Sequence, residues 1–329
     1  MMIESVQIEP NVVLAPLAGY TDSPMRRIAR SMGAGLVWTE MVSAEGLVRD
    51  SRRSMDLLRF EPEERPIAAQ LFGARPEAFR GAARMVSSLR PDLIDINAGC
   101  PARKVVKSGS GAALMLDTGR VREIVEATVE GAGDIPVTIK TRSGWSDDEP
   151  SAVETALAAV AGGARAVAVH PRTRTQGFKG RADWSVIRAV NDAVGVPVMG
   201  SGDVATPGDA IRMLDETGAA AVMIGRAAVG NPWLLERSAA ALAGERPPPE
   251  PDLGGRLRVA RRHFTLMLEW KGRPKGVFEM RKHFVAYLRG FPGVSDLRKR
   301  IVLIDDPDEV LALLDDALRK VGPEAGGSP

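Results

Sequence analysis

Short apolar runs alternate with longer amphipathic segments along most of the chain, and this alternation constrains the fold more than any other feature. The runs are rich in β-branched residues and number eight: Val12–Ala15, Leu36–Thr39, Ile67–Phe72, Leu93–Asn97, Val137–Thr141, Ala166–His170, Val196–Gly200 and Ala220–Ile224. Apolar residues within each run are nearly continuous, as is typical of strands buried on both faces of a parallel sheet. Eight strand–helix units over roughly 230 residues match the count and length of a (β/α)8 barrel.

The segments between the runs are amphipathic and carry helix start signals. They include Pro76–Leu89, Val121–Val129, Ala152–Ala161, Trp184–Asn191 and Thr206–Glu216. Two of them begin with a proline at the first helical position. We therefore predict the α/β class, with a (β/α)8 TIM barrel. A doubly wound open sheet is the alternative, but its first turn typically reads G-x-G-x-x-G, whereas residues 15–19 read Ala-Pro-Leu-Ala-Gly.

A proline-rich stretch separates this barrel from a second region. Four prolines lie between Gly244 and Gly255, and such a sequence favours a stiff, extended linker. The pattern beyond it is helical throughout: Arg256–Trp270, Val277–Leu288, Leu297–Ile304 and Pro307–Lys320. We predict the barrel over residues 1–243, a linker over 244–254, a small all-helical C-terminal domain over 255–321 and a disordered tail over 322–329.

Charge is distributed unevenly between these two regions. The formal net charge is only +2, but the window Gly255–Arg300 holds thirteen Lys or Arg and three Asp or Glu. That window therefore carries +10 and the rest of the chain −8. A basic domain attached to a mildly acidic body indicates a polyanionic partner such as a nucleic acid. The alternative is an ordinary solvated helical surface, on which Lys and Arg are common.

Cysteine usage and the apolar runs narrow the class of protein further. Cys100 is the one cysteine of the sequence, so no internal disulfide can form and a reducing cytoplasm is expected. Residues 1–10 lack the basic and apolar regions of a signal peptide. No apolar stretch approaches about 18 residues without a charge or proline, so no membrane span is expected. Cys100 has no neighbouring histidine or second cysteine, so no metal site is expected; we expect a monomer.

Polar residues gather where the predicted strands end, and in a barrel the carboxyl ends of the strands carry the active site. They are Glu40, Gln70, Asn97, Cys100, Lys140, Arg142, His170, Arg172, Ser201–Asp203 and Gly225–Arg226. Lys140 is the most informative, because an ammonium within an apolar strand is costly to bury without a partner. A structural ion pair is the alternative for Lys140. His170 directly follows a run of alanine and valine, and this position favours a site role over that of a structural core histidine.

Two glycine-rich turns follow the last two predicted strands, at Gly200–Asp203 and Ile224–Arg226. Barrel enzymes often bind a phosphate at this place through backbone N–H groups. Glycine lets the backbone approach such a ligand, and Arg226 adds positive charge. Because glycine is common in barrel turns, it is the location of these turns that favours a phosphate site.

Cys100 lies in the loop after the fourth predicted strand. The loop continues through Lys104 and Lys107 into the small-residue run Ser108–Ala113, and we interpret it as a mobile, basic lid. A thiol with a pKa of about 8.5 is mostly protonated at neutral pH. Cys100 can therefore act as an acid, or as a nucleophile if a neighbouring base lowers its pKa.

Taken together and in order, these motifs resemble the tRNA-dihydrouridine synthases. The resemblance covers the chain from about Leu14 to Trp233 and, more loosely, to Phe291. It rests on residues 14–22 (Leu-Ala-Pro-Leu-Ala-Gly-Tyr-Thr-Asp), 95–101 (Asp-Ile-Asn-Ala-Gly-Cys-Pro), 137–145 (Val-Thr-Ile-Lys-Thr-Arg-Ser-Gly-Trp), 170–173, 225–226 and 231–233. The segment Met280–His283 is most similar to the bacterial B-type branch.

The family uses FMN, and the resemblance implies roles position by position. The implied flavin-binding residues are Pro16, Leu17, Ala18, Gln70, Lys140, His170, Ser201, Gly202, Asp203, Gly225 and Arg226. The implied substrate-binding residues are Asn97, Lys104, Lys107, Arg142, Arg172, Arg281 and Lys282. Ser201 is a departure, because the family usually has asparagine there; the backbone donors are kept and the side-chain amide is lost.

The resemblance also implies a reaction. NADPH would reduce FMN, a hydride would pass from N5 of the flavin to carbon 6 of a D-loop uridine in tRNA, and Cys100 would protonate carbon 5 from the opposite face. Two alternatives stay open at this point. An FMN-dependent barrel acting on a small free pyrimidine, as dihydroorotate dehydrogenases do, leaves the basic helical domain without a role. A non-enzymatic tRNA-binding module leaves Lys140, His170 and Cys100 unexplained.

Overall fold

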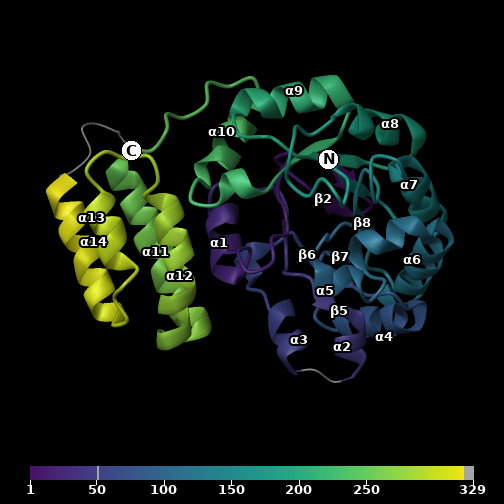
Figure 1. Ribbon diagram of the computed structural model, residues 1–329, viewed down its shortest axis with the longest axis horizontal. Helices are drawn as coiled ribbons and strands as arrows, with labels where there is room; N and C mark the ends of the chain where they lie inside the picture. Colours follow the sequence, from purple (N-terminus) through teal and green to yellow (C-terminus); the bar gives the residue numbers. More distant parts are fainter. Residues whose placement is uncertain (50–51, 322–329) are drawn as a thin grey trace.

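The computed structural model describes residues 1–49 and 52–321 and arranges the eight predicted strands as a parallel barrel (Figure 1). In chain order they are β3 (Val12–Leu14), β4 (Val37–Trp38), β6 (Ile67–Phe72), β7 (Leu93–Asn97), β8 (Val137–Arg142), β9 (Val167–His170), β10 (Val198–Ser201) and β11 (Ala221–Ile224). Strand β11 pairs with β3. Backbone hydrogen bonds from Leu14 N to Leu36 O (3.0 Å) and from Gly35 N to Val12 O (2.7 Å) close the barrel between β3 and β4. The predicted barrel is confirmed.

Helices surround the barrel on the outside (Figure 1). They are α1 (Ser23–Ser31), α2 (Ala44–Val48), α3 (Arg52–Leu58), α4 (Pro76–Ser87), α6 (Thr118–Ala132), α7 (Ala152–Ala161), α8 (Ser185–Ala193), α9 (Pro207–Thr217) and α10 (Trp233–Leu242). Local sequence explains their ends: Thr206 and Asp209 form a reciprocal capping box at the start of α9, and Gly218 ends it in the left-handed conformation at φ 69°. The five helices predicted within the barrel are all present.

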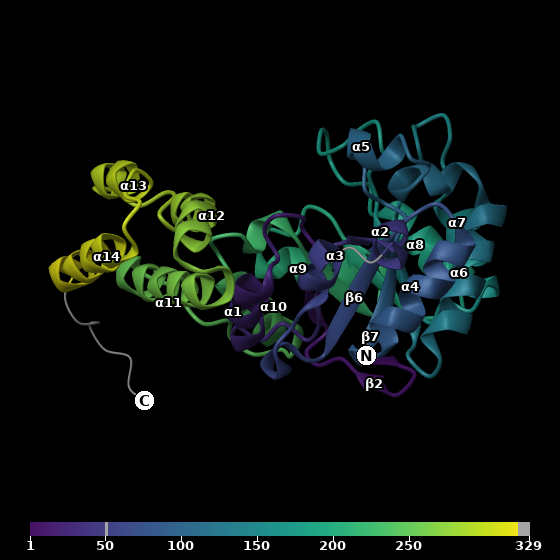
Figure 2. The ribbon, with the colours of Figure 1, turned by 90° about the horizontal axis from the view of Figure 1, so that it is seen from below.

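An N-terminal hairpin covers one end of the barrel and was not predicted. Strands β1 (Met2–Ile3) and β2 (Val6–Gln7) pair antiparallel, and Ile3 and Ile8 are fully buried in the cluster that fills the barrel interior. The hairpin lies at the end of the barrel opposite the short helix α5 (Arg103–Val106), as Figure 2 shows. A ligand therefore reaches the barrel from the α5 side, which is the carboxyl-terminal end of the strands. A further short strand, β5 (Val42–Ser43), pairs with β6.

Four helices follow the barrel: α11 (Leu253–Lys271), α12 (Arg273–Tyr287), α13 (Ser295–Ile301) and α14 (Pro307–Val321). They enclose an apolar core of their own that includes Phe264, Phe284 and Leu314. Residues 243–252, between α10 and α11, contain neither helix nor strand. The predicted all-helical C-terminal domain is confirmed, while its boundaries stay predictions. The predicted disordered tail, residues 322–329, lies outside the described residues.

The helical domain packs against the barrel beside α1 (Figure 1). Lys271 of α11 forms an ion pair with Asp22 at 2.5 Å, and Asp22 is also the residue that caps α1. The α12 residue Lys282 donates to the carbonyl of Gly19, in the loop that follows β3. Gly230 touches α12 so closely that an added Cβ would lie 2.4 Å from the carbonyl carbon of Ala286. These contacts hold the helical domain next to the loop that borders the barrel mouth.

Candidate active site

A cavity of about 500 Å³ opens at the carboxyl-terminal end of the barrel strands. Fourteen predicted site residues line it: Pro16, Leu17, Ala18, Gln70, Asn97, Cys100, Lys140, Arg142, His170, Ser201, Gly202, Asp203, Gly225 and Arg226. These residues come from every part of the barrel sequence and meet because parallel strands end on the same face. The volume falls in the range of small-molecule and cofactor sites.

A chain of buried hydrogen bonds runs beneath the cavity to Cys100. Asp95 is fully buried; one of its carboxylate oxygens accepts from Gln70 Nε2 at 2.7 Å and the other from Thr138 Oγ1 at 2.6 Å. Gln70 Oε1 accepts from Asn97 Nδ2 at 3.0 Å. Asn97 Oδ1 in turn accepts from the backbone N–H of Cys100 at 2.9 Å and of Gly99 at 3.2 Å. The side chains of three neighbouring strands therefore fix the backbone of the loop that carries Cys100.

Positive charge surrounds the Cys100 thiol. Burial raises the pKa of Cys100 above its ordinary value, and the charges of Arg142 and Lys140 act in the opposite direction. Arg142 also holds this loop, because its Nε donates to the carbonyl of Gly99 at 2.8 Å. With its raised pKa the thiol is protonated at neutral pH, so it is equipped to act as a proton donor rather than as a nucleophile.

Lys140 lies in β8 with its side chain at the cavity, and no hydrogen bond or ion pair joins its ammonium to another residue in the described part of the chain. Burial and then the repulsion of Arg142 lower the pKa of Lys140 to about 8, while the Asp95 carboxylate opposes this shift. The structural ion pair that was the alternative for Lys140 is therefore not formed with the described residues. An unpaired cation in a cavity can bind a polar or negatively charged ligand group.

His170 is buried at the end of β9, and its Nε2 has no hydrogen-bond partner among the described residues. Burial, followed by the positive charges of Lys140, Arg142 and Arg172, lowers the pKa of His170 to about 2. The imidazole is therefore neutral at physiological pH. His170 lines the cavity, and a neutral ring with an unpartnered nitrogen can donate one hydrogen bond to a bound ligand, or accept one from it.

The turn after β10 adopts a conformation that few residues tolerate. Gly202 has φ 115°, and a Cβ there would lie 3.1 Å from atoms of His170, Pro171 and Ala182. Asp203 follows with φ 56°, in the left-handed region that residues other than glycine seldom adopt. Its carboxylate accepts from the backbone of Ala182 at 2.7 Å. By contrast, a Cβ on Gly225 would make only an ordinary contact of 3.5 Å with Ala15, so close packing does not explain that glycine.

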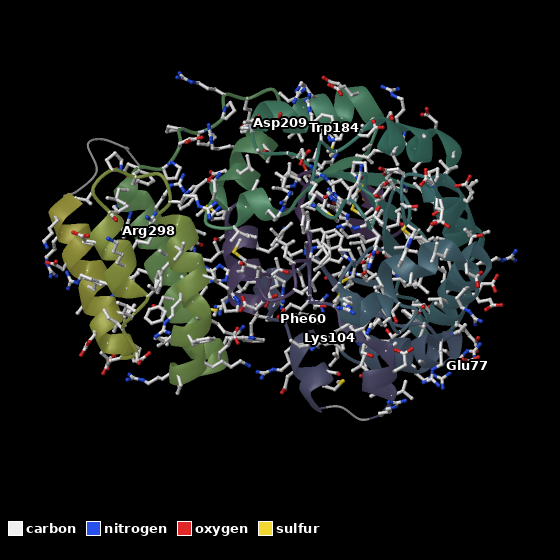
Figure 3. The ribbon with its side chains drawn as sticks, viewed as in Figure 1. Phe60, Glu77, Lys104, Trp184, Asp209 and Arg298 are labelled. Carbon is white, nitrogen blue, oxygen red and sulfur yellow. The ribbon has the colours of Figure 1, made fainter. Side chains whose placement is uncertain are left out.

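Five predicted substrate-binding residues lie outside the cavity lining: Lys104, Lys107, Arg172, Arg281 and Lys282. Lys104 and Lys107 are exposed on and next to α5. Arg172 is buried, and its guanidinium donates to Asp203 at 2.8 Å and to the carbonyls of Lys179 and Gly180. This network holds the two loops together and leaves Arg172 buried away from the cavity surface. Figure 3 shows Lys104 within the barrel domain and Arg298 in the separate helical domain.

Phe178 is a cavity residue that the sequence analysis did not identify. Its ring is about half exposed and lies in the loop after β9. The guanidinium carbons of Arg226 and Arg142 stand 4.2 Å and 5.7 Å from the ring centroid. Phe178 comes eight residues after His170, in a loop without helix or strand, so no strand-end pattern signals it.

The described residues contain no group of three or more potential metal ligands. None of the helices in the described part of the chain combines the length and apolar character that a membrane span needs.

The sequence matches the family described as "Dihydrouridine synthase (Dus)" over residues 13–322. A "Probable tRNA-dihydrouridine synthase" of Rhizobium leguminosarum bv. phaseoli is 41% identical over 315 residues, which is 95% of this chain and 96% of the relative. Proteins of the same description from Rhodobacter capsulatus (39% identical; 95% of this chain and 96% of the relative) and Rickettsia typhi (36% identical; 93% of each) are also similar.

Solved structures of low sequence identity share the fold. A 2-naphthoyl-CoA reductase complex aligns with a TM-score of 0.59 at 12% identity, covering 74% of this chain and 52% of that one. Morphinone reductase aligns with a TM-score of 0.54 at 17% identity, covering 76% of this chain and 90% of that one. At these identities the likeness supports the barrel alone. The family match and the curated relatives, which span nearly the whole chain, show that this protein belongs to the dihydrouridine synthase family.

Proposed function

We propose that this protein reduces specific uridines of tRNA to 5,6-dihydrouridine, with FMN as cofactor, NADPH as reductant and Cys100 as the proton donor. The observation that carries the proposal is a single cavity lined by a protonated thiol, an unpaired lysine and an unpartnered neutral histidine. Three curated relatives described as probable tRNA-dihydrouridine synthases support the choice of tRNA as substrate.

The residues present fit a flavin. Lys140 offers a cation and His170 an unpartnered ring nitrogen, and both suit the carbonyl-rich edge of an isoalloxazine ring. Gly202 has no side chain, so a phosphate can approach the backbone of the turn that lines the same cavity. The exposed Arg226 adds a cation for the phosphate. When bound and reduced, FMN supplies the hydride. A cation beside the ring also stabilises negative charge on its reduced form.

The protein's own groups then serve the substrate. Cys100 holds a proton at Sγ because burial raises its pKa, and it delivers that proton to carbon 5 of the uracil ring. Asn97 has committed one amide N–H to Gln70, which leaves its second N–H for a carbonyl of the base. Arg142 anchors the Cys100 loop through Gly99 and so keeps the thiol in reach of the ring.

The substrate's size explains the second domain. A uridine inside folded tRNA must leave its stack to enter a cavity at a barrel mouth. The window Gly255–Arg300 carries +10, and helices α11 and α12 of that window pack beside α1, next to the loop that borders the cavity. We infer that these helices bind tRNA phosphates, with Lys104 and Lys107 contributing from the α5 side.

The direct test replaces the proton donor. Purified protein is incubated with NADPH and tRNA from a strain lacking the enzyme, and dihydrouridine is measured by mass spectrometry. Cys100→Ala is expected to lower the rate of dihydrouridine formation about 10²–10⁴-fold, the usual effect of removing a general acid. Absorbance of bound flavin should be unchanged, because Cys100 is not proposed to bind it. Dihydrouridine formation by Cys100→Ala at the wild-type rate would refute the assignment of the acid.

The same preparation separates the alternatives. Reduction of free uridine as fast as reduction of tRNA would favour a barrel enzyme for small pyrimidines. A colourless protein that binds tRNA and takes up no FMN would favour a binding module. The proposal expects a yellow protein that acts on tRNA and is slow on the free nucleoside.

A further inference from the structure

Asp95 is a buried ionisable residue that takes no direct part in the reaction proposed above. Its side chain has no exposed surface and does not line the cavity. It pairs in register with Gln70 of β6 on one side and with Thr138 of β8 on the other. Burying a carboxylate is costly. The presence of Asp95 in the barrel interior therefore indicates a role that an apolar residue could not perform.

The hydrogen bonds of Asp95 have a direction that passes along the chain. An ionised carboxylate can only accept, so the Gln70 amide must turn its NH₂ group toward Asp95. The carbonyl of Gln70 then faces Asn97 and requires a donor there. Asn97 must therefore present its own NH₂ to Gln70 and its carbonyl oxygen to the backbone N–H groups of Gly99 and Cys100.

The reverse direction would set donors against donors. If the Gln70 amide were turned over, its NH₂ would face the NH₂ of Asn97. Turning Asn97 as well would place its NH₂ against the two backbone N–H groups of Gly99 and Cys100, and these would lose their acceptor. Thr138 donates to the second oxygen of Asp95, so both carboxylate oxygens accept a hydrogen bond from a neighbouring strand.

We propose that Asp95 is a positioning residue: together with the backbone N–H groups at the other end, it fixes the direction of the hydrogen-bond chain through Gln70 and Asn97 and thereby holds the backbone of Cys100. The inference rests on the proposed function only in taking Cys100 as the acid. A simpler role for Asp95 would be that of a counter-ion for Lys140, because the two residues lie near enough for each charge to shift the pKa of the other. The two roles differ: a counter-ion must be charged, whereas a direction-setting group must accept a hydrogen bond.

Cys100 itself supplies a probe, because the sequence contains no other cysteine. The rate at which iodoacetamide alkylates Cys100 in the purified protein, measured at pH 8, reports the thiol's position without tRNA. Asp95→Leu removes the acceptor and is expected to change that rate about tenfold, the effect of losing one buried hydrogen bond. Asp95→Asn keeps an acceptor oxygen for Gln70 and is expected to stay within about twofold of wild type.

Thr138→Val is the matched control. It removes the donor from the other oxygen of the same carboxylate, in the same buried layer, and leaves the bond to Gln70 intact. Its alkylation rate is expected within about twofold of wild type. If Asp95→Leu does not fold, Asp95→Ala replaces it, and if neither folds the Asp95→Asn comparison still decides. The proposal is overturned if Asp95→Asn changes the alkylation rate as much as Asp95→Leu or Asp95→Ala does, because the charge of Asp95 would then matter. If only Asp95→Asn folds, a change of about tenfold in its alkylation rate overturns the proposal.

A double-mutant cycle tests whether Asp95 acts through Asn97. In an Asn97→Ala background, Asp95→Leu (or Asp95→Ala) should change the alkylation rate no further, because the link to Cys100 is already broken. Additive effects would overturn the proposal. The outcome is independent of the proposed function. Wild-type protein that forms no dihydrouridine would refute the proposed function, whereas additive effects on the alkylation rate would refute only the role of Asp95.

Discussion

At the residue scale, Asp95 combines a cost in stability with a benefit in geometry. Burial raises the pKa of Asp95 to about 6, although hydrogen bonds from Gln70 and Thr138 and the charge of Lys140 oppose the shift. A carboxyl group whose pKa is higher in the folded than in the unfolded protein destabilises the fold when it is ionised. The residue is thus kept in the barrel interior for something other than stability.

Asp95→Asn is therefore expected to stabilise the protein at pH 8. Between about pH 4 and pH 6 the folded wild type binds a proton that the unfolded chain releases, so its stability falls as pH rises through this window. The asparagine variant lacks this loss. Its free energy of unfolding should exceed that of wild type by up to about 3 kcal/mol at pH 8 and by less at pH 5. Thermal unfolding at both pH values measures the difference, and a gain that is larger at pH 5 would contradict it.

Single residues also show what sequence could predict of the site. The sequence predicts Lys140, His170 and Cys100 as site residues because the first lies within an apolar run, the second ends one and the third follows one in a loop. The ends of parallel strands meet on one face of a barrel. The partner of Arg172 could not be predicted in this way. Its ion pair with Asp203 joins two loops 31 residues apart, and loop conformation leaves no periodic signal in the sequence.

At the element scale, the segment after β7, for which the sequence predicts a mobile, basic lid, has regular structure. It contains helix α5 and the 3-10 helix η2 (Gly111–Leu116). The backbone N–H of Ala112 donates to the carbonyl of Cys100 at 3.1 Å. Within the small-residue run Ser108–Ala113, Gly111 allows close packing: a Cβ there would lie 2.7 Å from the Cys100 carbonyl oxygen.

Gly111→Ala is accordingly expected to displace Cys100 and to lower kcat for dihydrouridine formation about tenfold or more, since a misplacement of 1 Å in a reacting group can cost 10²-fold. Gly109→Ala is the matched control. Both glycines have positive φ, 60° and 75°, but a Cβ on Gly109 would meet only Ala74 at 3.5 Å. Gly109→Ala should lose about 1 kcal/mol of stability and keep its kcat. Equal losses of kcat in the two variants would show that strain alone, not contact with Cys100, is responsible.

At the scale of the whole molecule, the order of the elements was predictable and the meeting of the two domains was not. Eight apolar runs and a proline-rich linker are local patterns, and they predicted a barrel followed by helices. The ion pair between Lys271 and Asp22 joins residues 249 positions apart in the sequence, and nothing local indicates it. The N-terminal hairpin was missed for a related reason: its strands have only two residues each, too short to show alternation.

Charge removal tests the proposal that the basic helices bind tRNA phosphates. Lys299 and Arg300 are exposed on α13 within the +10 window. Lys299→Gln with Arg300→Gln should weaken tRNA binding and lower the slope of log affinity against log salt by about one to two, because each phosphate contact releases roughly one counter-ion. Arg319→Gln with Lys320→Gln removes the same charge from α14, outside the window, where Asp316 already pairs with both residues. That control should leave the slope nearly unchanged. Filter binding of tRNA over a salt series measures the slope for both double variants. Equal slopes for the two double variants would mean that the net charge of the domain governs binding, and not a defined phosphate contact at α13.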